Sequence, residues 1–307
     1  MKKKISLIIL LLFLTIIFTG CTKYIKDDNK KIVKNEETGQ NIVENILCRP
    51  EAKKTLEVYE EYKIDISKLP KCSNFKVNSG GYEGIWNTLF VKPLAWILLK
   101  IGYLVKNFGL SIIIVTFLIR LILVPITKNA TTQSENMKKV KPEMDKLEAK
   151  YKNKNDQESM MQKSQEMLVL YKKYNINPLT GCLFAFIQIP LFMSFFEALY
   201  RLPAIFEGKF GPFQLGTTPL IAITSGKYWY IILSILVFAV TFYSFKFNGM
   251  GAMNKDQEKQ MKMMKNISFI LIGITSFTVS SAICIYWIIN SGFTVIQNLY
   301  MKMEKKK

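Results

Sequence analysis

The sequence predicts an all-α membrane protein with five transmembrane helices, a cytoplasmic antiparallel helical hairpin and an interfacial amphipathic helix. Half of the 307 residues are hydrophobic and 13% are aromatic, and they gather in long blocks, as in helices that span lipid. Lysine-rich segments alternate with segments poor in basic residues, and the basic ones are expected on the cytoplasmic side. The charged stretch after the first block repeats apolar residues at helical spacing, which predicts the hairpin.

The chain contains no histidine and carries a formal net charge of +19. Without imidazole, Ser-His-Asp and Cys-His nucleophilic machinery and His-ligated zinc are excluded, so we expect neither an enzyme nor a metal or organic cofactor. The sequence has no Walker-type phosphate loop or other nucleotide fingerprint, so we expect no bound nucleotide.

Residues 1–20 have the plan of a secretory signal. Three lysines precede the apolar stretch Ile5–Phe18, and small residues then lead to Cys21. This ending resembles the bacterial lipobox, in which the cysteine is lipidated and becomes the mature N-terminus, although Phe18 stands where Leu is usual. We expect a lipoprotein signal peptide with fatty acylation at Cys21, and the alternative is an uncleaved anchor helix. Both interpretations place the residues that follow outside the cell.

Residues 21–82 are expected to form an extracellular N-terminal segment. From Thr22 to Tyr82 there are 12 basic and 10 acidic residues, a composition that suits a small exposed domain or a tether. Cys48 and Cys72 lie here, and the sequence leaves open whether they form a disulfide or remain two thiols.

Residues 83–107 are expected to form the interfacial amphipathic helix. Its apolar residues are interrupted by a proline and three lysines, namely Lys92, Pro93, Lys100 and Lys106. Three cations argue against a spanning helix. Aromatic residues on the amphipathic pattern favour a helix that lies flat in the interface with its lysines snorkelling. A poor transmembrane span is the alternative.

Five apolar segments are expected to cross the membrane, and they are 108–127, 179–200, 228–247, 266–279 and 282–301. The last two come from one apolar run, Ile267–Met301, which is too long for one crossing of a core about 30 Å thick. Lysines flank both ends of this run, so both ends prefer the cytoplasm and the number of crossings is even, with a turn at Val279–Ser281. The N-terminus is therefore expected outside, and the C-terminus inside, a bacterial plasma membrane.

Charge assigns the segments between the spans. Residues 128–178 carry 11 lysines against 7 acids and are expected to be cytoplasmic. Two apolar seams on either side of the polar break Asn153–Asp156 predict the hairpin, with a kink or restart at Pro142. The seams are Met137, Val140, Met144, Leu147 and Tyr151, then Met160, Ser164, Met167, Tyr171 and Tyr174. The remaining segments are an extracellular loop (201–227), a cytoplasmic loop (248–265) and a cytoplasmic tail (302–307).

Arg120 lies near the middle of the first span, where a cation costs roughly 2.5–3.5 kcal/mol. The chain has 39 Lys and 3 Arg, so an arginine here indicates a need for a permanent charge with donors in a planar fork. The alternative is pairing with an acid, but the only acid in any predicted span is Glu197, whose more natural partner is Arg201. We therefore expect Arg120 to face a hydrated cavity.

Polar side chains on other spans are expected to line the same cavity. Asn and Gln are costly to bury in lipid, which makes them better candidates for a wet surface than Ser or Thr. The sequence therefore predicts a polar groove contributed by at least three helices. Its candidate residues are Arg120, Gln188, Asn290 and Gln297, and Trp287 shares one face of the last span with Asn290 and Gln297 at helical spacing.

Four segments carry a family resemblance. They are NPLTGCLFAFIQIPLFMSFFEALYR, IYWIINSGFTVIQ, the arginine-bearing IIIVTFLIRLILVPIT and MKKVKPEMDKLEAKYKNK. Over about residues 85–301 the chain resembles the YidC/Oxa/Alb family of membrane protein insertases, and the lipobox with five spans resembles its Gram-positive form. Two positions depart from the pattern. Phe184 stands where a Pro usually follows Gly-Cys-Leu, and Val279–Ala282 replaces a Phe-Pro-Ala-Gly-like turn.

The resemblance implies an insertase and chaperone for nascent integral membrane proteins, acting alone or with the Sec translocon. It implies that Arg120 lies in a hydrophilic groove open to the cytoplasm and to lipid but closed to the outside. Gln188, Trp287, Asn290 and Gln297 fall in the stretches that match this groove. The implied partners are nascent membrane proteins, membrane lipids, the Sec translocon and the ribosome. Two other classes stay open. A small-solute or ion transporter predicts intramembrane acids and broken helices, and a structural lipoprotein subunit of the translocon predicts a partner carboxylate for Arg120.

Overall fold

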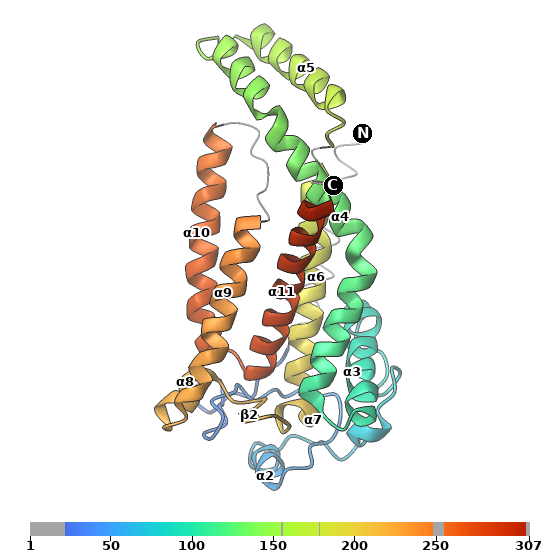
Figure 1. Cartoon of the computed structure of the whole chain (residues 1–307). Helices are drawn as coiled ribbons and strands as arrows, with labels where there is room; N and C mark the ends of the chain where they lie inside the picture. Colours follow the sequence, from blue (N-terminus) through green and yellow to red (C-terminus); the bar gives the residue numbers. More distant parts are fainter. Residues whose placement is uncertain (1–21, 155, 178, 248–254, 305–307) are drawn as a thin grey trace. The chain divides into compact units, whose positions relative to one another are not determined.

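The structure, a computed structural model, describes residues 22–154, 156–177, 179–247 and 255–304, which are mainly helical (Figure 1). The predicted signal peptide and Cys21 lie outside these residues. Contacts divide the chain into two compact units. The first contains the described residues of Met1–Leu118, Ile189–Val237 and Thr275–Ile289, and the second those of Ile119–Gln188, Phe238–Ile274 and Asn290–Lys307.

Long helices account for most of the described chain. They are α3 (Lys92–Leu104), α4 (Phe108–Tyr151), α5 (Gln157–Lys173), α6 (Leu179–Arg201), α9 (Ile231–Phe247), α10 (Lys255–Thr278) and α11 (Ser281–Glu304). The short elements are α2 (Lys53–Glu61), α7 (Pro203–Phe206), α8 (Pro219–Thr224), a π turn (Asn87–Val91) and the 3-10 turns Cys72–Asn74 and Tyr228–Tyr230. Strands β1 (Lys209–Phe210) and β2 (Phe213–Gln214) pair antiparallel, with Phe210 opposite Phe213.

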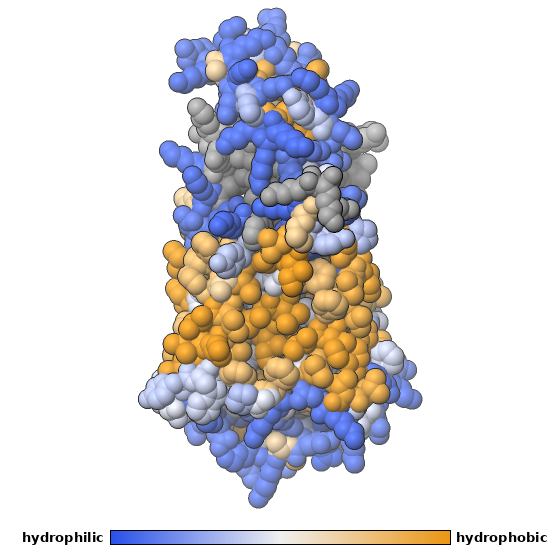
Figure 2. All heavy atoms as spheres, viewed as in Figure 1, coloured by the Kyte–Doolittle hydropathy of each residue, from blue (hydrophilic) through white to orange (hydrophobic). Residues whose placement is uncertain are grey.

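Three of the described helices are long and apolar enough to cross a membrane, and they cover Phe108–Tyr151, Tyr228–Lys246 and Ser281–Met303. On the face shown in Figure 2, hydrophobic side chains gather over the lower and middle parts of the long helices, whereas α5, the end of α4 beside it and the N-terminal segment around α2 are mainly hydrophilic. Between α10 and α11 the chain turns at Val279 and Ser280, within the tripeptide named from the sequence.

Helix α4 is longer than the sequence predicted. The first span and the first half of the hairpin form one continuous helix, which passes through Pro125 and Pro142 without ending. The alternative of a restart at Pro142 is therefore wrong. An interior proline costs about 3 kcal/mol, but Val140 and Met144 on either side of it are fully buried, and their burial offsets that cost.

The end of α4 packs against α5 (Figure 1). Lys150 pairs with Glu166 at 2.5 Å and Lys173 with Glu143 at 3.2 Å, so the two helices run in opposite directions. All five residues of the first seam are buried, together with Tyr171 of α5 and the neighbouring Ile176.

The second seam is only half correct, because Met160 and Ser164 are exposed. With Lys150 opposite Glu166, the position opposite Met160 lies beyond the last residue of α4, Tyr151. The start of α5 therefore has no helix to pack against within the described residues.

Both ends of α5 follow from local chemistry. Its N-cap is Asp156, whose carboxylate accepts a hydrogen bond of 2.8 Å from the backbone N–H of Ser159. At the other end Asn175 adopts φ 51°, and the N–H of Ile176 donates to the carbonyl of Tyr171, which is a Schellman motif.

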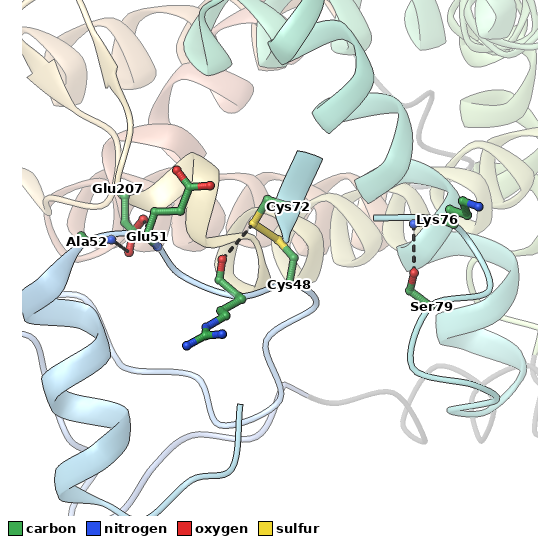
Figure 3. Close-up of a disulfide and its surroundings, with 8 residues drawn as sticks. Cys48, Glu51, Ala52, Cys72, Lys76, Ser79 and Glu207 are labelled. Carbon is green, nitrogen blue, oxygen red and sulfur yellow. Dashed lines mark hydrogen bonds between the residues drawn. A yellow bond between two sulfur atoms is a disulfide. The ribbon is translucent and has the colours of Figure 1, made fainter. Parts of the chain in front are cut away.

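The N-terminal segment is folded rather than an extended tether. Its buried apolar residues are Ile25, Ile42, Val43, Ile46, Leu47, Tyr59 and Phe75. Cys48 and Cys72 form a disulfide, which resolves the alternative that the sequence left open (Figure 3). In the same view Glu207 accepts hydrogen bonds from the backbone N–H groups of Glu51 and Ala52, at 3.1 and 3.2 Å, and so joins the start of α2 to the chain after α7.

Helix α3 exposes Trp96, Tyr103 and Leu104. Lys100 and Lys106 are exposed, but Lys92 is buried, so the expectation that its lysines snorkel is wrong for Lys92. The ammonium of Lys92 donates to the carbonyls of Ser79 and Gly81, at 2.8 and 2.6 Å, and pairs with Glu83 at 3.0 Å. An ammonium has three donors, and these three partners satisfy them away from water.

Candidate functional site

Arg120 lies within α4 and is 4% exposed. Its Nε donates a hydrogen bond of 2.7 Å to the side-chain oxygen of Asn290, on α11, which is also buried. Two residues that the sequence named separately are therefore in direct contact in the second unit. Asn290 is a neutral amide, so this contact satisfies one donor of the guanidinium without itself supplying a counter-charge.

Gln297 makes a second contact between the same two helices. Its Nε2 donates to the hydroxyl of Thr127 at 2.6 Å. Gln188, on α6 in the second unit, is half-buried. The structure thus brings Arg120, Asn290 and Gln297 onto one α4–α11 seam.

Trp287 belongs to the first unit and is described with it. Its ring meets the ring of Phe192, on α6, at a centroid distance of 5.6 Å in an edge-to-face arrangement. Such aromatic pairs contribute about 0.5–1.5 kcal/mol beyond their burial. Trp287 therefore has a packing role in this structure.

Sequence reasoning missed Thr127, Thr131 and Asn298. The hydroxyl of Thr131 lies 3.4 Å from the side-chain oxygen of Asn298, which adds a third polar contact between α4 and α11. A signal was present, because Thr127 follows Arg120 by seven positions as Gln297 follows Asn290. Once Arg120 and Asn290 are known to be in contact, equal spacing places Thr127 and Gln297 two turns further along both helices.

A second polar cluster surrounds the buried Arg201, at the end of α6 in the first unit. Its guanidinium donates to the side chains of Glu83 and Asn87, each at 2.7 Å, and to the carbonyl of Asn45 at 2.6 Å. The cluster ties the N-terminal segment and the π turn to the end of α6.

Glu197 is a weaker partner of Arg201 than the sequence suggested. Its Oε2 lies 4.0 Å from Nη1 of Arg201, and its Oε1 accepts a 2.9 Å hydrogen bond from the indole N–H of Trp86. Glu83 binds Arg201 more closely. Burial alone raises the pKa of Glu83, but the hydrogen bonds and charges of Arg201 and Lys92 outweigh it and hold that pKa below its usual value.

The cysteines offer little chemistry among the described residues. Cys48 and Cys72 are bonded to each other, and Cys284 is buried with its thiol 3.4 Å from the carbonyl of Ser276. In the described ranges no group of three or more Cys, Asp or Glu side chains is placed to hold a metal ion.

Comparison with known proteins gives consistent matches. The family model described as 60Kd inner membrane protein matches residues 100–307. The membrane protein insertase YidC of Oceanobacillus iheyensis is 31% identical over 229 residues, covering 73% of this chain and 87% of the relative. The membrane protein insertase MisCA of Bacillus subtilis is 35% identical over 218 residues, covering 71% of this chain and 79% of the relative.

A solved structure, that of an active YidC insertase with its first transmembrane domain resolved, matches at 24% identity and a TM-score of 0.48. The match covers 81% of this chain and 52% of the solved one, so this chain spans about half the length of that protein. On the family model and the two curated relatives, the chain belongs to the 60Kd inner membrane protein family, which includes the YidC and MisCA membrane protein insertases.

Proposed function

We propose that the chain is a membrane protein insertase, which moves short polar or acidic segments of nascent membrane proteins across lipid and helps their helices to enter and fold. Its membership of a family whose relatives are named membrane protein insertases supports this. Partition of the substrate's own apolar helix into lipid supplies the free energy, so the process needs no nucleotide.

The proposed topology has five spans in a bacterial plasma membrane. The three helices that are long and apolar enough supply the spans 108–127, 228–247 and 282–301, and α6 and α10 supply 179–200 and 266–279. Helix α3 lies in the outer interface, and Cys21 carries the lipid anchor outside. The lysine-rich hairpin 128–178, the loop 248–265 and the tail 302–307 lie in the cytoplasm.

The observation that carries the mechanism is a buried arginine whose side chain meets a neutral amide, Arg120 with Asn290. A carboxylate carries a full negative charge and can accept two parallel hydrogen bonds from the guanidinium fork, whereas the Asn290 oxygen accepts one from Nε. An acidic substrate segment therefore competes well against Asn290 for the guanidinium. This exchange lowers the cost of carrying the acid through the apolar layer, where a charge costs a few kcal/mol.

The proposed groove is partly filled with water and has Arg120, Gln188, Asn290 and Gln297 on its walls. Trp287 precedes Asn290 by three residues, about one turn, on α11. In a region of low dielectric constant the attraction between a guanidinium and a carboxylate is stronger than in water. The groove also shortens the apolar distance that the substrate must cross.

We further propose that the exposed face of α5 receives substrates and partners, including the Sec translocon and the ribosome. Four large apolar side chains, Met160, Met161, Leu168 and Val169, are more than half exposed there. Methionine adapts to varied apolar surfaces because its side chain is unbranched and polarizable. Lysines on the same helix add attraction for acidic partners.

The test is complementation of a bacterial strain depleted of its own insertase, followed by insertion of a small single-span substrate with an acidic external segment. The variants are Arg120→Glu, Arg120→Ala and Arg120→Lys. The matched control is Arg49→Glu, which makes the same charge reversal at an exposed arginine. All variants are compared at equal membrane levels.

We expect the wild type and Arg49→Glu to rescue insertion, Arg120→Lys to rescue it in part, and Arg120→Glu to lower it at least tenfold. If all variants rescue equally, Arg120 does not act on the substrate. If the wild type itself does not rescue insertion, the chain is not an insertase for this substrate class. That result would favour a transporter or a structural subunit instead.

A further inference from the structure

Helices α4 and α11 are joined by polar contacts at three levels of the second unit. The pairs are Arg120 with Asn290, Thr127 with Gln297, and Thr131 with Asn298. Sequence separations within the pairs are 170, 170 and 167 residues. A nearly constant separation means that the two helices run side by side in the same direction.

The first two pairs match closely in spacing. Seven residues of α-helix rise about 10.5 Å, so both helices advance by the same length between the arginine pair and the glutamine pair. Gln297 and Asn290 therefore lie on one face of α11, two turns apart. Because α11 is one continuous helix, a contact that fixes its rotation about its own axis at Gln297 also fixes the direction of the Asn290 side chain.

The Thr127–Gln297 pair is well suited to fix this rotation. The Thr127 hydroxyl lies 3.0 and 3.1 Å from the carbonyls of Val124 and Leu123 in its own helix, so it donates there. A hydroxyl has one proton and two lone pairs, and one lone pair of Thr127 accepts from Nε2 of Gln297 at 2.6 Å. Both side chains are thus held in one orientation.

The hydrogen bond of the third pair, Thr131 with Asn298, is weaker than that of Thr127 with Gln297. The Thr131 hydroxyl lies 3.0 Å from the carbonyl of Thr127 and 3.4 Å from the Asn298 oxygen. Its single proton cannot serve both acceptors fully, and the intrahelical one is closer. The Thr127–Gln297 contact is therefore the stronger of the two contacts that flank Arg120 on this side.

We propose that Thr127 and Gln297 are positioning residues for insertion, which hold α11 at the rotation where Asn290 meets Arg120. This rests on the proposed function. A rotation of α11 by about 20° moves an atom at the helix surface, roughly 5–6 Å from the axis, by about 2 Å. That displacement breaks the 2.7 Å hydrogen bond between Nε of Arg120 and Asn290 and removes its contribution to the orientation of the guanidinium.

Orientation matters because arginine recognises a carboxylate through a planar fork. A free arginine side chain has about 2 kcal/mol of rotamer entropy, and a pre-oriented fork loses less of it when a carboxylate binds. The Asn290 contact, kept in place by the contact two turns away, contributes to this orientation at Nε. Substrates with acidic segments are the ones that benefit.

The experiment measures insertion of two substrates that differ only in their external segment, acidic in one and with each Asp replaced by Asn in the other. The variants are Thr127→Val, Gln297→Met, their combination, and the conservative Thr127→Ser. The matched control is Thr116→Val, at a buried threonine of α4 whose hydroxyl donates to Ile112 of its own helix at 2.6 Å. Insertion is scaled to the amount of each variant in the membrane.

We expect Thr127→Val and Gln297→Met each to lower insertion of the acidic substrate about 3- to 15-fold, the range of one interhelical hydrogen bond, and the neutral substrate less than twofold. The double variant should be no worse than the worse single variant, and Thr127→Ser and Thr116→Val should behave as wild type.

Equal losses for both substrates mean a general packing role and overturn the proposal. No loss in Thr127→Val, with the acidic substrate still dependent on Arg120, overturns the proposal and leaves the insertase function intact. Indifference of the acidic substrate to Arg120→Glu overturns both the charged mechanism and its positioning residues.

Discussion

The side-chain oxygen of Asn290 lies 2.7 Å from Nε of Arg120, so the buried cation of α4 contacts a neutral acceptor on α11. An amide can be displaced by a stronger acceptor, whereas a carboxylate at the same place would form a permanent ion pair. In the proposed mechanism, the neutral amide at residue 290 therefore leaves this contact open to exchange with an acidic substrate segment.

We predict that Asn290→Asp lowers insertion of acidic substrates about tenfold, because a built-in carboxylate binds Arg120 more tightly than an amide does. Insertion assays in a depleted strain measure this. Asn266→Asp, at an exposed position of α10, is the control for adding an acid to this part of the chain. Unchanged insertion in Asn290→Asp would show that substrates do not compete for Arg120.

Glu83→Gln is expected to destabilise the first unit. Glu83 pairs with Arg201 at 2.7 Å and with Lys92 at 3.0 Å, and both cations are only 1% exposed. Removing one partner of a buried pair costs about 3–5 kcal/mol of unfolding free energy. Because a third of the Glu83 side chain is exposed, we expect a smaller loss of about 2–3 kcal/mol. Thermal unfolding in detergent measures this. Glu57→Gln, which removes an exposed pair with Lys53, should leave the Tm unchanged, and equal Tm values for both variants would contradict the prediction.

The contribution of Glu83 should also depend on pH. Its pKa in the folded protein is held below the usual 4.5, so its stabilisation is complete above about pH 4.5 and is lost as the pH falls through the lowered pKa. The Tm gap between wild type and Glu83→Gln should be constant from pH 6 to 8 and shrink in acid. A gap that widens in acid would mean that burial outweighs the cations and raises the pKa.

The disulfide should stabilise the N-terminal segment through the loop it closes. Cys48 and Cys72 are 24 residues apart, and closing a loop of this length contributes about 3–4 kcal/mol in the chain-entropy model. The Cys48→Ser/Cys72→Ser variant should become sensitive to protease between residues 22 and 82, while wild type under non-reducing conditions resists. Equal cleavage in both would assign the order of this segment to its apolar core and the Arg201 cluster alone.

Alanine variants of two methionines in the hairpin should distinguish a role in packing from a role in substrate binding. Met144 is 1% exposed in the core between α4 and α5, so Met144→Ala should cost about 2–5 kcal/mol of hairpin stability. Met161 is 59% exposed, so Met161→Ala should leave the Tm unchanged and weaken substrate cross-linking to α5. Unchanged cross-linking in Met161→Ala would remove α5 from the proposed receiving surface.

Much of the helical organisation could be predicted from periodicity and charge, because both act locally. The seam of Met137 and Val140 and the turn at Val279 are examples. The limit of the second seam could not be predicted, because it depends on where α4 ends opposite α5. The prediction of a helix restart at Pro142 is wrong for a related reason. The cost of a proline within the helix is offset by burial of neighbouring side chains in the core between α4 and α5, which periodicity alone does not measure.

The candidate site shows the same division. Arg120, Asn290 and Gln297 could be named singly because polar groups in an apolar stretch are costly. Their partners could not, since Thr127 is an ordinary residue for a membrane helix until Gln297 is found opposite it. Lys92 was misassigned because its three acceptors come from a loop whose path no sequence pattern indicates.

The cluster at Arg201 also bears on how the chain itself is made. Asn45, Glu83 and Asn87 are synthesised first, and the arginine that binds all three follows more than 110 residues later, at the end of α6. In the proposed orientation, Arg201 reaches them only if α6 crosses the membrane in the correct direction. An inverted α6 would leave Arg201 in the cytoplasm and its acceptors outside unfilled. The hydrogen bonds of this cluster therefore stabilise the chain only when α6 has been inserted in the correct direction.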